Sequence, residues 1–98
     1  MKISDVRVRI ARNETDAKLR AYVDITIEDS FVIHGLKVIE GKNGKFVAMP
    51  SRKMPNGEYK DIAHPILTDV RNDITNSVLA KYEEVAATVS EEEIVTHE

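Results

Sequence analysis

The stretch LRAYVDITI, from Leu19 to Ile27, decides the fold of this 98-residue chain. Its aliphatic side chains alternate with polar or aromatic ones along the whole stretch. A period of two is typical of a strand with one buried face, because successive side chains of a strand point to opposite sides. The stretch therefore predicts a half-buried strand, and it is the clearest strand pattern in the chain.

The segment before this strand has the same period. Val6, Val8 and Ile10 alternate with arginines and a small alanine, which predicts an earlier strand with one apolar and one charged face. The polar residues 12–18 between the two strands indicate a loop or a hairpin connection. The first third of the chain is thus predicted to form neighbouring strands.

The segment after Ile27 carries apolar residues on both sides. Phe31–His34 and Leu36–Ile39 flank Gly35, and a glycine within a strand pattern predicts a bulge or a bend. Simple alternation gives the strand one face with Val32, His34, Leu36 and Val38 and another with Phe31, Ile33 and Ile39. One helix cannot cover both faces, so we predict a partner surface, most simply a second copy of the chain. A locally thick core is the alternative.

Turn residues divide the middle of the chain. Asn43 and Gly44 both tolerate positive φ and stand between apolar runs, which predicts a hairpin with a returning strand over residues 45–49. Pro50 ends that strand because it has no N–H for the ladder. All three prolines and a second Asn-Gly pair punctuate residues 50–65, so we predict an ordered loop or a short hairpin arm there.

Beyond this segment the period becomes helical. Four apolar residues recur every four positions, the spacing of one helix face: Val70, Ile74, Val78 and Tyr82. We predict an amphipathic helix from Asp69 to about Ala87, with Thr68 as its N-cap.

Together these elements predict an α+β domain in residues 1–87. Its fold is an antiparallel meander of four or more strands followed by a C-terminal amphipathic helix. Residues 88–98 contain Glu91, Glu92 and Glu93 and few large apolar groups, which predicts an acidic, flexible tail.

The composition is that of one small domain without thiol chemistry. Hydrophobic residues make up 42% of the chain and cysteine is absent, which excludes disulfides, thiolate metal sites and a Cys nucleophile. No run approaches the ~18 apolar residues of a membrane span, and the N-terminus lacks the apolar core of a signal peptide. We therefore expect a cytoplasmic protein with no membrane partner.

The net charge of -3 conceals a division along the chain. Residues 1–60 carry 12 basic and 8 acidic side chains, a balance of +4, whereas residues 61–98 carry 2 basic and 9 acidic ones, a balance of -7. Between Lys42 and Lys60 five basic residues face only Glu58. This asymmetry indicates an anionic partner for the basic segment. A chance cluster of surface lysines is the alternative.

Candidates for catalysis or metal binding are weakly placed. Asp61 and His64 lie three positions apart, where a hydrogen bond between them would close the turn before the helix. His34 falls on an apolar strand face, which favours a core or interface histidine, and His97 lies in the tail. The chain has no HExxH or His-x-His motif, and neither Ser51 nor Ser77 has a base at a recognisable spacing. We expect no enzyme activity, no metal, no cofactor and no small-molecule substrate.

The segment from Phe46 to Ile66 resembles a known family. It reads FVAMPS, a basic pair at 52 and 53, PNGEYK and DIAHPI, the order of motifs in the SpoVG family, the stage V sporulation protein G or septation regulators of bacteria. The opening MKISDVR and the later FVIH are similar too, so the resemblance covers about residues 1–87. It departs at Leu67-Thr68, where many members have Asn-Ser, and in the tail, which varies in the family.

The resemblance implies a small homodimeric regulator that binds DNA, and in some members RNA. It implies effects on septum formation, sporulation or virulence-type gene expression, and a fold in which two chains pair by exchanging or joining strands. Carried over by position, it assigns phosphate contacts to Arg52 and Lys53, with Lys60 beside them and Arg71 near the start of the helix.

Arg7 and Arg9, on the polar face of the first strand, have two open interpretations. They extend the basic track, or they only keep an exposed sheet edge soluble. The expected binding is mainly electrostatic, with release of condensed counterions from a phosphate backbone. Two other functions remain as alternatives: a protein-binding adaptor whose basic loop engages an acidic partner, and a hydrolase or metal enzyme that uses Asp61 or His64.

Overall fold

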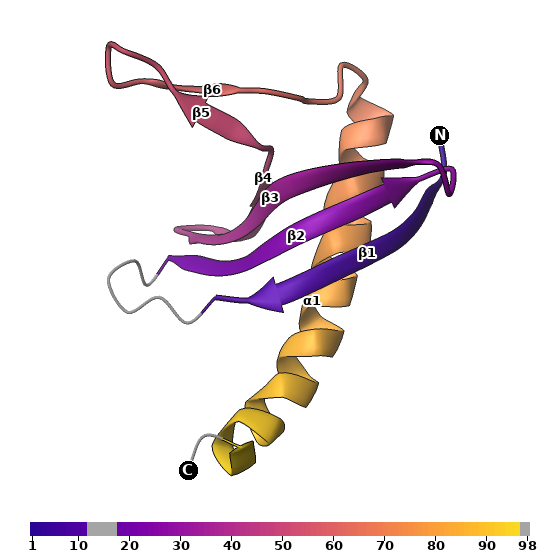
Figure 1. Ribbon diagram of the computed structural model, residues 1–98, viewed down its shortest axis with the longest axis vertical. Coiled ribbons are helices and arrows are strands. Elements are labelled where there is room, and N and C mark those ends of the chain that lie inside the picture. The colour runs from indigo at the N-terminus through magenta and orange to yellow at the C-terminus, as the bar shows by residue number, and fades with distance from the viewer. Residues whose placement is uncertain (12–17, 97–98) are drawn as a thin grey trace.

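A four-stranded antiparallel sheet forms the centre of the molecule (Figure 1). The computed structural model describes the backbone of residues 1–11 and 18–96 and side chains up to Thr88. The connection predicted at residues 12–17 lies outside this part. The strands follow one another as a meander in the order β1-β2-β3-β4, with the bounds β1 Ile3–Ile10, β2 Leu19–Ile27, β3 Phe31–Gly41 and β4 Gly44–Ala48.

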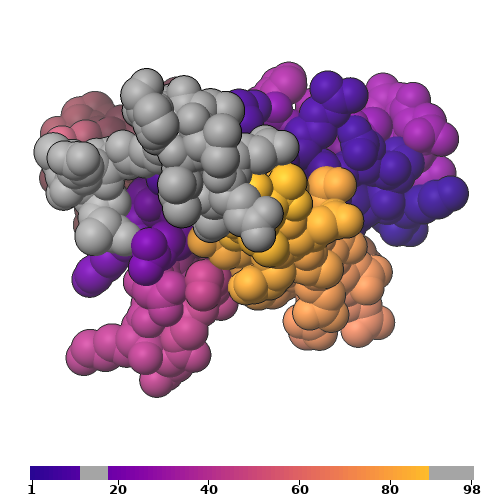
Figure 2. All heavy atoms as spheres, turned by 90° about the horizontal axis from the view of Figure 1, so that it is seen from below, coloured from indigo at the N-terminus to yellow at the C-terminus, as the bar shows by residue number. Residues whose placement is uncertain are grey.

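The helix α1 covers one face of this sheet. It runs from Thr68 to Thr96, passes behind the strands in Figure 1 and projects with its C-terminal part beyond β1. Seen from below, the orange and gold atoms of α1 lie against the indigo atoms of β1 (Figure 2). The predicted α+β fold, a meander followed by a C-terminal helix, is therefore confirmed.

The aliphatic half of each alternation points toward α1. Val23 lies opposite Val8 of β1 and Leu36 of β3, and its side chain is fully buried. The helix meets this layer with the predicted stripe, which buries Ile74, Val78 and Tyr82. Burial of apolar surface contributes roughly 25 cal/mol per Å², so this two-layer core is the main source of stability.

Gly35 introduces the bulge that the sequence predicts. Between Val23 and Ile25 the chain of β2 advances by two residues, while β3 advances by three between Ile33 and Leu36. Gly35 has a φ of 88°, a conformation that costs glycine nothing but strains other L residues. The bulge therefore inserts one extra residue into β3 at the position where a side chain would be disfavoured.

The extra residue corrects the predicted faces of β3. Leu36 shares the face toward α1 with Ile33, whereas the side chain of His34 lies on the opposite face of the sheet and is 76% exposed. We call the face turned away from α1 the outer face. The assignment of His34 and Leu36 to one apolar face was wrong, because simple alternation is reversed by a bulge. The outer face of β3 is still partly apolar, since Val32 is 45% exposed there.

The segments after β3 follow the turn residues. The predicted hairpin at the Asn-Gly pair is confirmed, because β3 and β4 close where Gly41 pairs with Gly44. Beyond Pro50 the chain forms β5 (Ser51–Lys53) and β6 (Tyr59–Asp61), which pair with each other as a separate two-stranded sheet. Of the two alternatives for this segment, the short hairpin arm is correct. In Figure 1 the arm projects away from the four-stranded sheet.

The ends of α1 differ from the predicted ones. The N–H of Arg71 donates to the carbonyl of Leu67 at 3.1 Å, so Leu67 accepts the first helical hydrogen bond and Thr68 lies inside the helix instead of capping it. The predicted end near Ala87 was wrong, because the helical backbone continues to Thr96. Of the residues in this extension, the glutamates 91–93 have high helix propensity, whereas its threonines, valines and isoleucine have a lower one. Flexibility of residues 88–98 stays a prediction. In the described part of the chain, no helix has the length and apolar character needed to cross a membrane.

Candidate nucleic-acid interface

The register of the β5–β6 arm sets its two faces. Arg52 lies directly opposite Lys60, and Lys53 lies opposite Tyr59. Because neighbours along a strand point to opposite sides, Arg52 and Lys60 share one face of the arm, and Lys53 and Tyr59 share the other. All the residues of β5 and β6 are exposed. The structure thus brings Arg52 and Lys60 together and turns Lys53 to the other side.

Like charges face each other across the arm. Directly opposite side chains in an antiparallel pair have Cβ atoms about 4.5–5.5 Å apart, and like charges there destabilise the pair. Among the described residues, no carboxylate forms an ion pair within 4.0 Å of Arg52, Lys53 or Lys60. The Arg52–Lys60 pair therefore favours an anion between its two cations, and a phosphate offers the charge and the acceptor oxygens that both side chains bind.

Backbone hydrogen bonds hold the arm in shape. At its tip the N–H of Met54 donates to the carbonyl of Glu58 at 2.7 Å, and the N–H of Gly57 donates to the carbonyl of Met54 at 2.9 Å. At its base the N–H of Ile62 donates to the carbonyl of Pro50 at 2.7 Å. A two-stranded hairpin alone is only marginally stable in water. An anion that bridges the opposed cations would therefore stabilise the arm as well as bind to it.

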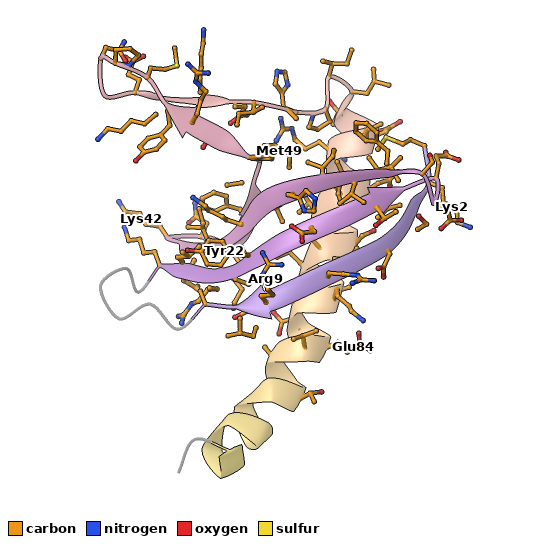
Figure 3. The ribbon with its side chains drawn as sticks, in the orientation of Figure 1. Lys2, Arg9, Tyr22, Lys42, Met49 and Glu84 are labelled. Carbon is orange, nitrogen blue, oxygen red and sulfur yellow. The ribbon has the colours of Figure 1, made fainter. Side chains whose placement is uncertain are left out.

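Arg7 and Arg9 lie on a different surface. They belong to β1, the edge of the sheet farthest from β4, and Figure 3 shows Arg9 on the outer face near Tyr22. The guanidinium of Arg7 is 3.1 Å from the carboxylate of Asp5, and that of Arg9 is 3.1 Å from Asp24. Each arginine already has a carboxylate partner, whereas no ion pair to the cations of the arm occurs in the part of the chain that the structure describes. Whether they bind nucleic acid stays a prediction.

Asp24 joins three segments on the outer face. It accepts hydrogen bonds from Arg9 at 3.1 Å and from the N–H of Gly35 at 3.3 Å, and the Nδ1 of His34 lies 3.3 Å from its Oδ1. Burial raises the pKa of Asp24, but the hydrogen bonds from Arg9, Gly35 and His34 outweigh burial and bring the pKa below its usual 3.8. His34 is thus an exposed partner of Asp24, so the core alternative was wrong, and the interface alternative stays a prediction.

Arg71 occupies a third position, in the first turn of α1. Its side chain is exposed, and no ion pair to it occurs among the described residues. Residues 62–70 separate it from the arm in the chain. A cation at the N-terminal end of a helix adds to the positive end of the helix dipole, so this position is suited to an anion. Its part in binding stays a prediction.

Asp61 and His64 do not form the predicted turn contact. The Nδ1 of His64 is 3.2 Å from the carbonyl oxygen of Pro65, and no hydrogen bond joins His64 to Asp61 in the described structure. Both residues instead line a shallow hollow beside the arm, together with Tyr59 and Lys60. His97 lies outside the described residues.

Tyr59 is the residue of this surface that the sequence analysis missed. Its side chain is 69% exposed and lies opposite Lys53. The available signal was an aromatic residue in a basic segment interrupted by proline and glycine. That pattern alone does not separate a surface ring from one that folds back onto a core.

Comparison with known proteins assigns the family. The SpoVG family profile matches residues 1–84. The SpoVG protein of Acholeplasma laidlawii is 54% identical over 96 residues, which cover 95% of this chain and 100% of its own. The SpoVG protein of Clostridium kluyveri is 51% identical over 96 residues, which cover 96% and 98%. The names of both relatives associate them with septation. The resemblance found in the sequence is confirmed, and this chain belongs to the SpoVG family.

Proposed function

We propose that this protein is a cytoplasmic regulator that binds nucleic acid, in the first place DNA, through the β5–β6 arms of a homodimer. Its family relatives are named for septation, and we extend this association to control of septation, sporulation or gene expression. The protein acts by occupying nucleic acid, with no chemical step of its own.

The observation that carries the proposal is the Arg52–Lys60 pair. Two exposed cations lie directly opposite each other on an arm that projects from the sheet. Such a pair lowers stability unless an anion is present. Contacts of these side chains with a phosphate backbone release condensed counterions, which gives affinity with little dependence on sequence.

A second copy of the chain is proposed because the outer face of the sheet exposes large apolar side chains. Tyr22, Val32 and Phe46 are 37%, 45% and 48% exposed there, while α1 covers the other face. A two-fold dimer would also present two arms to one nucleic acid. Sedimentation equilibrium should give about twice the chain mass of 11.0 kDa. A strict monomer at working concentrations would rule the dimer out.

The salt dependence of binding tests the assigned surface. Each phosphate contact contributes about -0.9 to the slope of log affinity against log salt. In the double variant Arg52→Ala/Lys60→Ala the slope should flatten by about 1.8 if one chain engages, and by up to about 3.6 if both arms of a dimer do. The circular dichroism spectrum and the oligomeric state should be the same as in the wild type.

Arg7→Ala/Arg9→Ala is a charge-matched comparison, because it removes the same two positive charges from the far edge of the sheet. Its slope should change less, since both arginines are already paired with carboxylates. If both double variants flatten the slope equally, nucleic acid contacts both surfaces. If Arg52→Ala/Lys60→Ala binds like the wild type, the arm is not the interface.

A protein-binding adaptor is the second candidate. It is favoured by the segment between β6 and α1, where Ile62, Ile66 and Leu67 are 65%, 88% and 61% exposed. An adaptor needs no nucleic acid. Absence of binding to unrelated duplex DNA, single-stranded DNA and RNA at low salt would therefore reject the proposed function in favour of the adaptor.

A further inference from the structure

The hollow beside the arm contains groups that a purely electrostatic contact does not use. It is lined by Tyr59, Lys60, Asp61 and His64. The ring of Tyr59 is 69% exposed, and Asp61 has no ion pair among the described residues. An aromatic ring this exposed contributes little to a core. Phosphate binding alone gives no reason for a ring and a carboxylate at this place.

A ring beside cations suits a single strand. Proteins that bind single strands stack bases on aromatic side chains while nearby cations follow the phosphates. Tyr59 lies opposite Lys53 on the same face of the arm, so a base stacked on the ring would have the cation of Lys53 near its phosphate. A duplex keeps the faces of its bases inside its own stack, and only unpaired bases are available to a ring.

Asp61 adds discrimination in the same direction. Its carboxylate repels phosphates, which penalises the closely spaced phosphates of a duplex brought against the arm. The same carboxylate accepts hydrogen bonds from N–H groups on base edges. The pairing edges of bases are free only in unpaired nucleic acid. Tyr59 therefore favours a single strand, and Asp61 disfavours a duplex.

We propose, on the basis of the nucleic-acid binding proposed above, that the hollow at Tyr59 holds an unpaired base. The protein consequently binds single-stranded nucleic acid more tightly than duplex. Tyr59 stacks on the base, Lys53 contacts the adjoining phosphate, and Asp61 accepts a hydrogen bond from the base edge.

Fluorescence anisotropy with the full chain tests this assignment. The probes are a labelled single-stranded DNA of mixed sequence and the same DNA annealed to its complement, at equal salt. Tyr59→Ala should weaken single-strand binding by about 5- to 150-fold, the equivalent of roughly 1–3 kcal/mol, and leave the duplex and the salt slope unchanged. Tyr59→Phe is the matched control, because it keeps the ring and should keep the affinity. Asp61→Asn should raise the affinity for duplex and so reduce the preference of the protein for the single strand over the duplex.

A variant with a larger ring tests whether a loss of affinity in Tyr59→Ala is caused by unfolding of the arm. Tyr59→Trp should raise single-strand affinity and not duplex affinity. The inference would be overturned if Tyr59→Ala bound the single strand as tightly as the wild type does. It would also be overturned if the wild type bound duplex more tightly than the single strand. Either result would leave the proposed function in place. If Arg52→Ala/Lys60→Ala lost affinity for both the single strand and the duplex while Tyr59→Ala bound both like the wild type, binding would depend on phosphate contacts alone. That result would also overturn the inference. Failure of the wild type to bind either probe would overturn both proposals.

Discussion

The backbone of Gly35 faces Pro50, the residue at which the chain leaves the sheet for the arm. A β-carbon at position 35 would stand 3.6 Å from the Cβ of Pro50, an ordinary van der Waals distance. The positive φ of Gly35, 88°, is therefore required by the backbone of the bulge and not by lack of space. The N–H of Ile62 donates to the Pro50 carbonyl at 2.7 Å, which closes the base of the arm next to this position.

Gly35→Ala should destabilise the protein by roughly 1–3 kcal/mol, because an L residue at this φ is strained. Urea unfolding should show a lower midpoint with an unchanged slope. Gly57→Ala is the matched control: Gly57 also has a positive φ, 93°, but lies in open space at the tip of the arm. It should affect global unfolding less. Equal midpoints for Gly35→Ala and the wild type would contradict the assigned role of the bulge.

Asp24→Asn should cost about 1 kcal/mol near neutral pH, because the charge that Arg9 and His34 face on the outer surface is lost. The lowered pKa of Asp24 means that its carboxylate stabilises the fold above the usual value of 3.8, and that this contribution disappears as the pH falls through the lower pKa of the folded state. The difference between variant and wild type should therefore vanish in strong acid.

Urea unfolding at neutral pH and well below 3.8 measures this difference. Asp5→Asn is the control, since it also loses a carboxylate paired with an arginine, but the Asp5 side chain is 49% exposed against 16% for Asp24. A surface pair contributes less. A cost for Asp24→Asn that persists unchanged into acid would show that the charge is not its source.

Lys60→Glu should stabilise the arm and weaken binding at the same time. Glutamate opposite Arg52 would form a cross-strand pair of opposite charges, which contributes roughly 0.2–1 kcal/mol. Amide hydrogen exchange at Met54 and Ile62, whose N–H groups close the tip and the base of the arm, should slow. Affinity for nucleic acid should fall.

The neutral variant Lys60→Gln separates the two effects of Lys60→Glu. It removes the repulsion without adding an attraction, so exchange should slow less and affinity should fall less. Faster exchange in Lys60→Glu would mean that Arg52 and Lys60 do not destabilise each other.

Removal of Ser90–Glu98 should leave nucleic-acid affinity the same or raise it. The segment carries four acidic side chains, Glu91, Glu92, Glu93 and Glu98, so its loss changes the net charge from -3 to +1. A less negative chain is repelled less by a polyanion. The truncated helix should still fold, because the buried stripe ends at Tyr82. A clear loss of affinity with the fold intact would place the tail in contact with nucleic acid.

Local patterns in the sequence determined the elements and most of the core. The alternation in LRAYVDITI, the Asn43-Gly44 turn and the four-residue spacing of Ile74 and Val78 each depend on neighbours a few positions away. The folded structure agrees with these local predictions because it buries the apolar face of each predicted element. The motif between residues 46 and 66 also gave the family, since a long ordered motif is specific without any knowledge of contacts.

The tertiary structure decided what depends on pairing between distant residues. A bulge at Gly35 was predictable, but the strand that receives the extra residue, and hence the outward turn of His34, is set by the register with β2. Likewise, the sequence placed Arg52 and Lys53 together as a basic pair. Only the pairing of β5 with β6 set Arg52 against Lys60 and moved Lys53 to the face of Tyr59. Register depends on the pairing of residues that are far apart in the chain, across the whole sheet. It therefore cannot be predicted from the order of neighbouring residues.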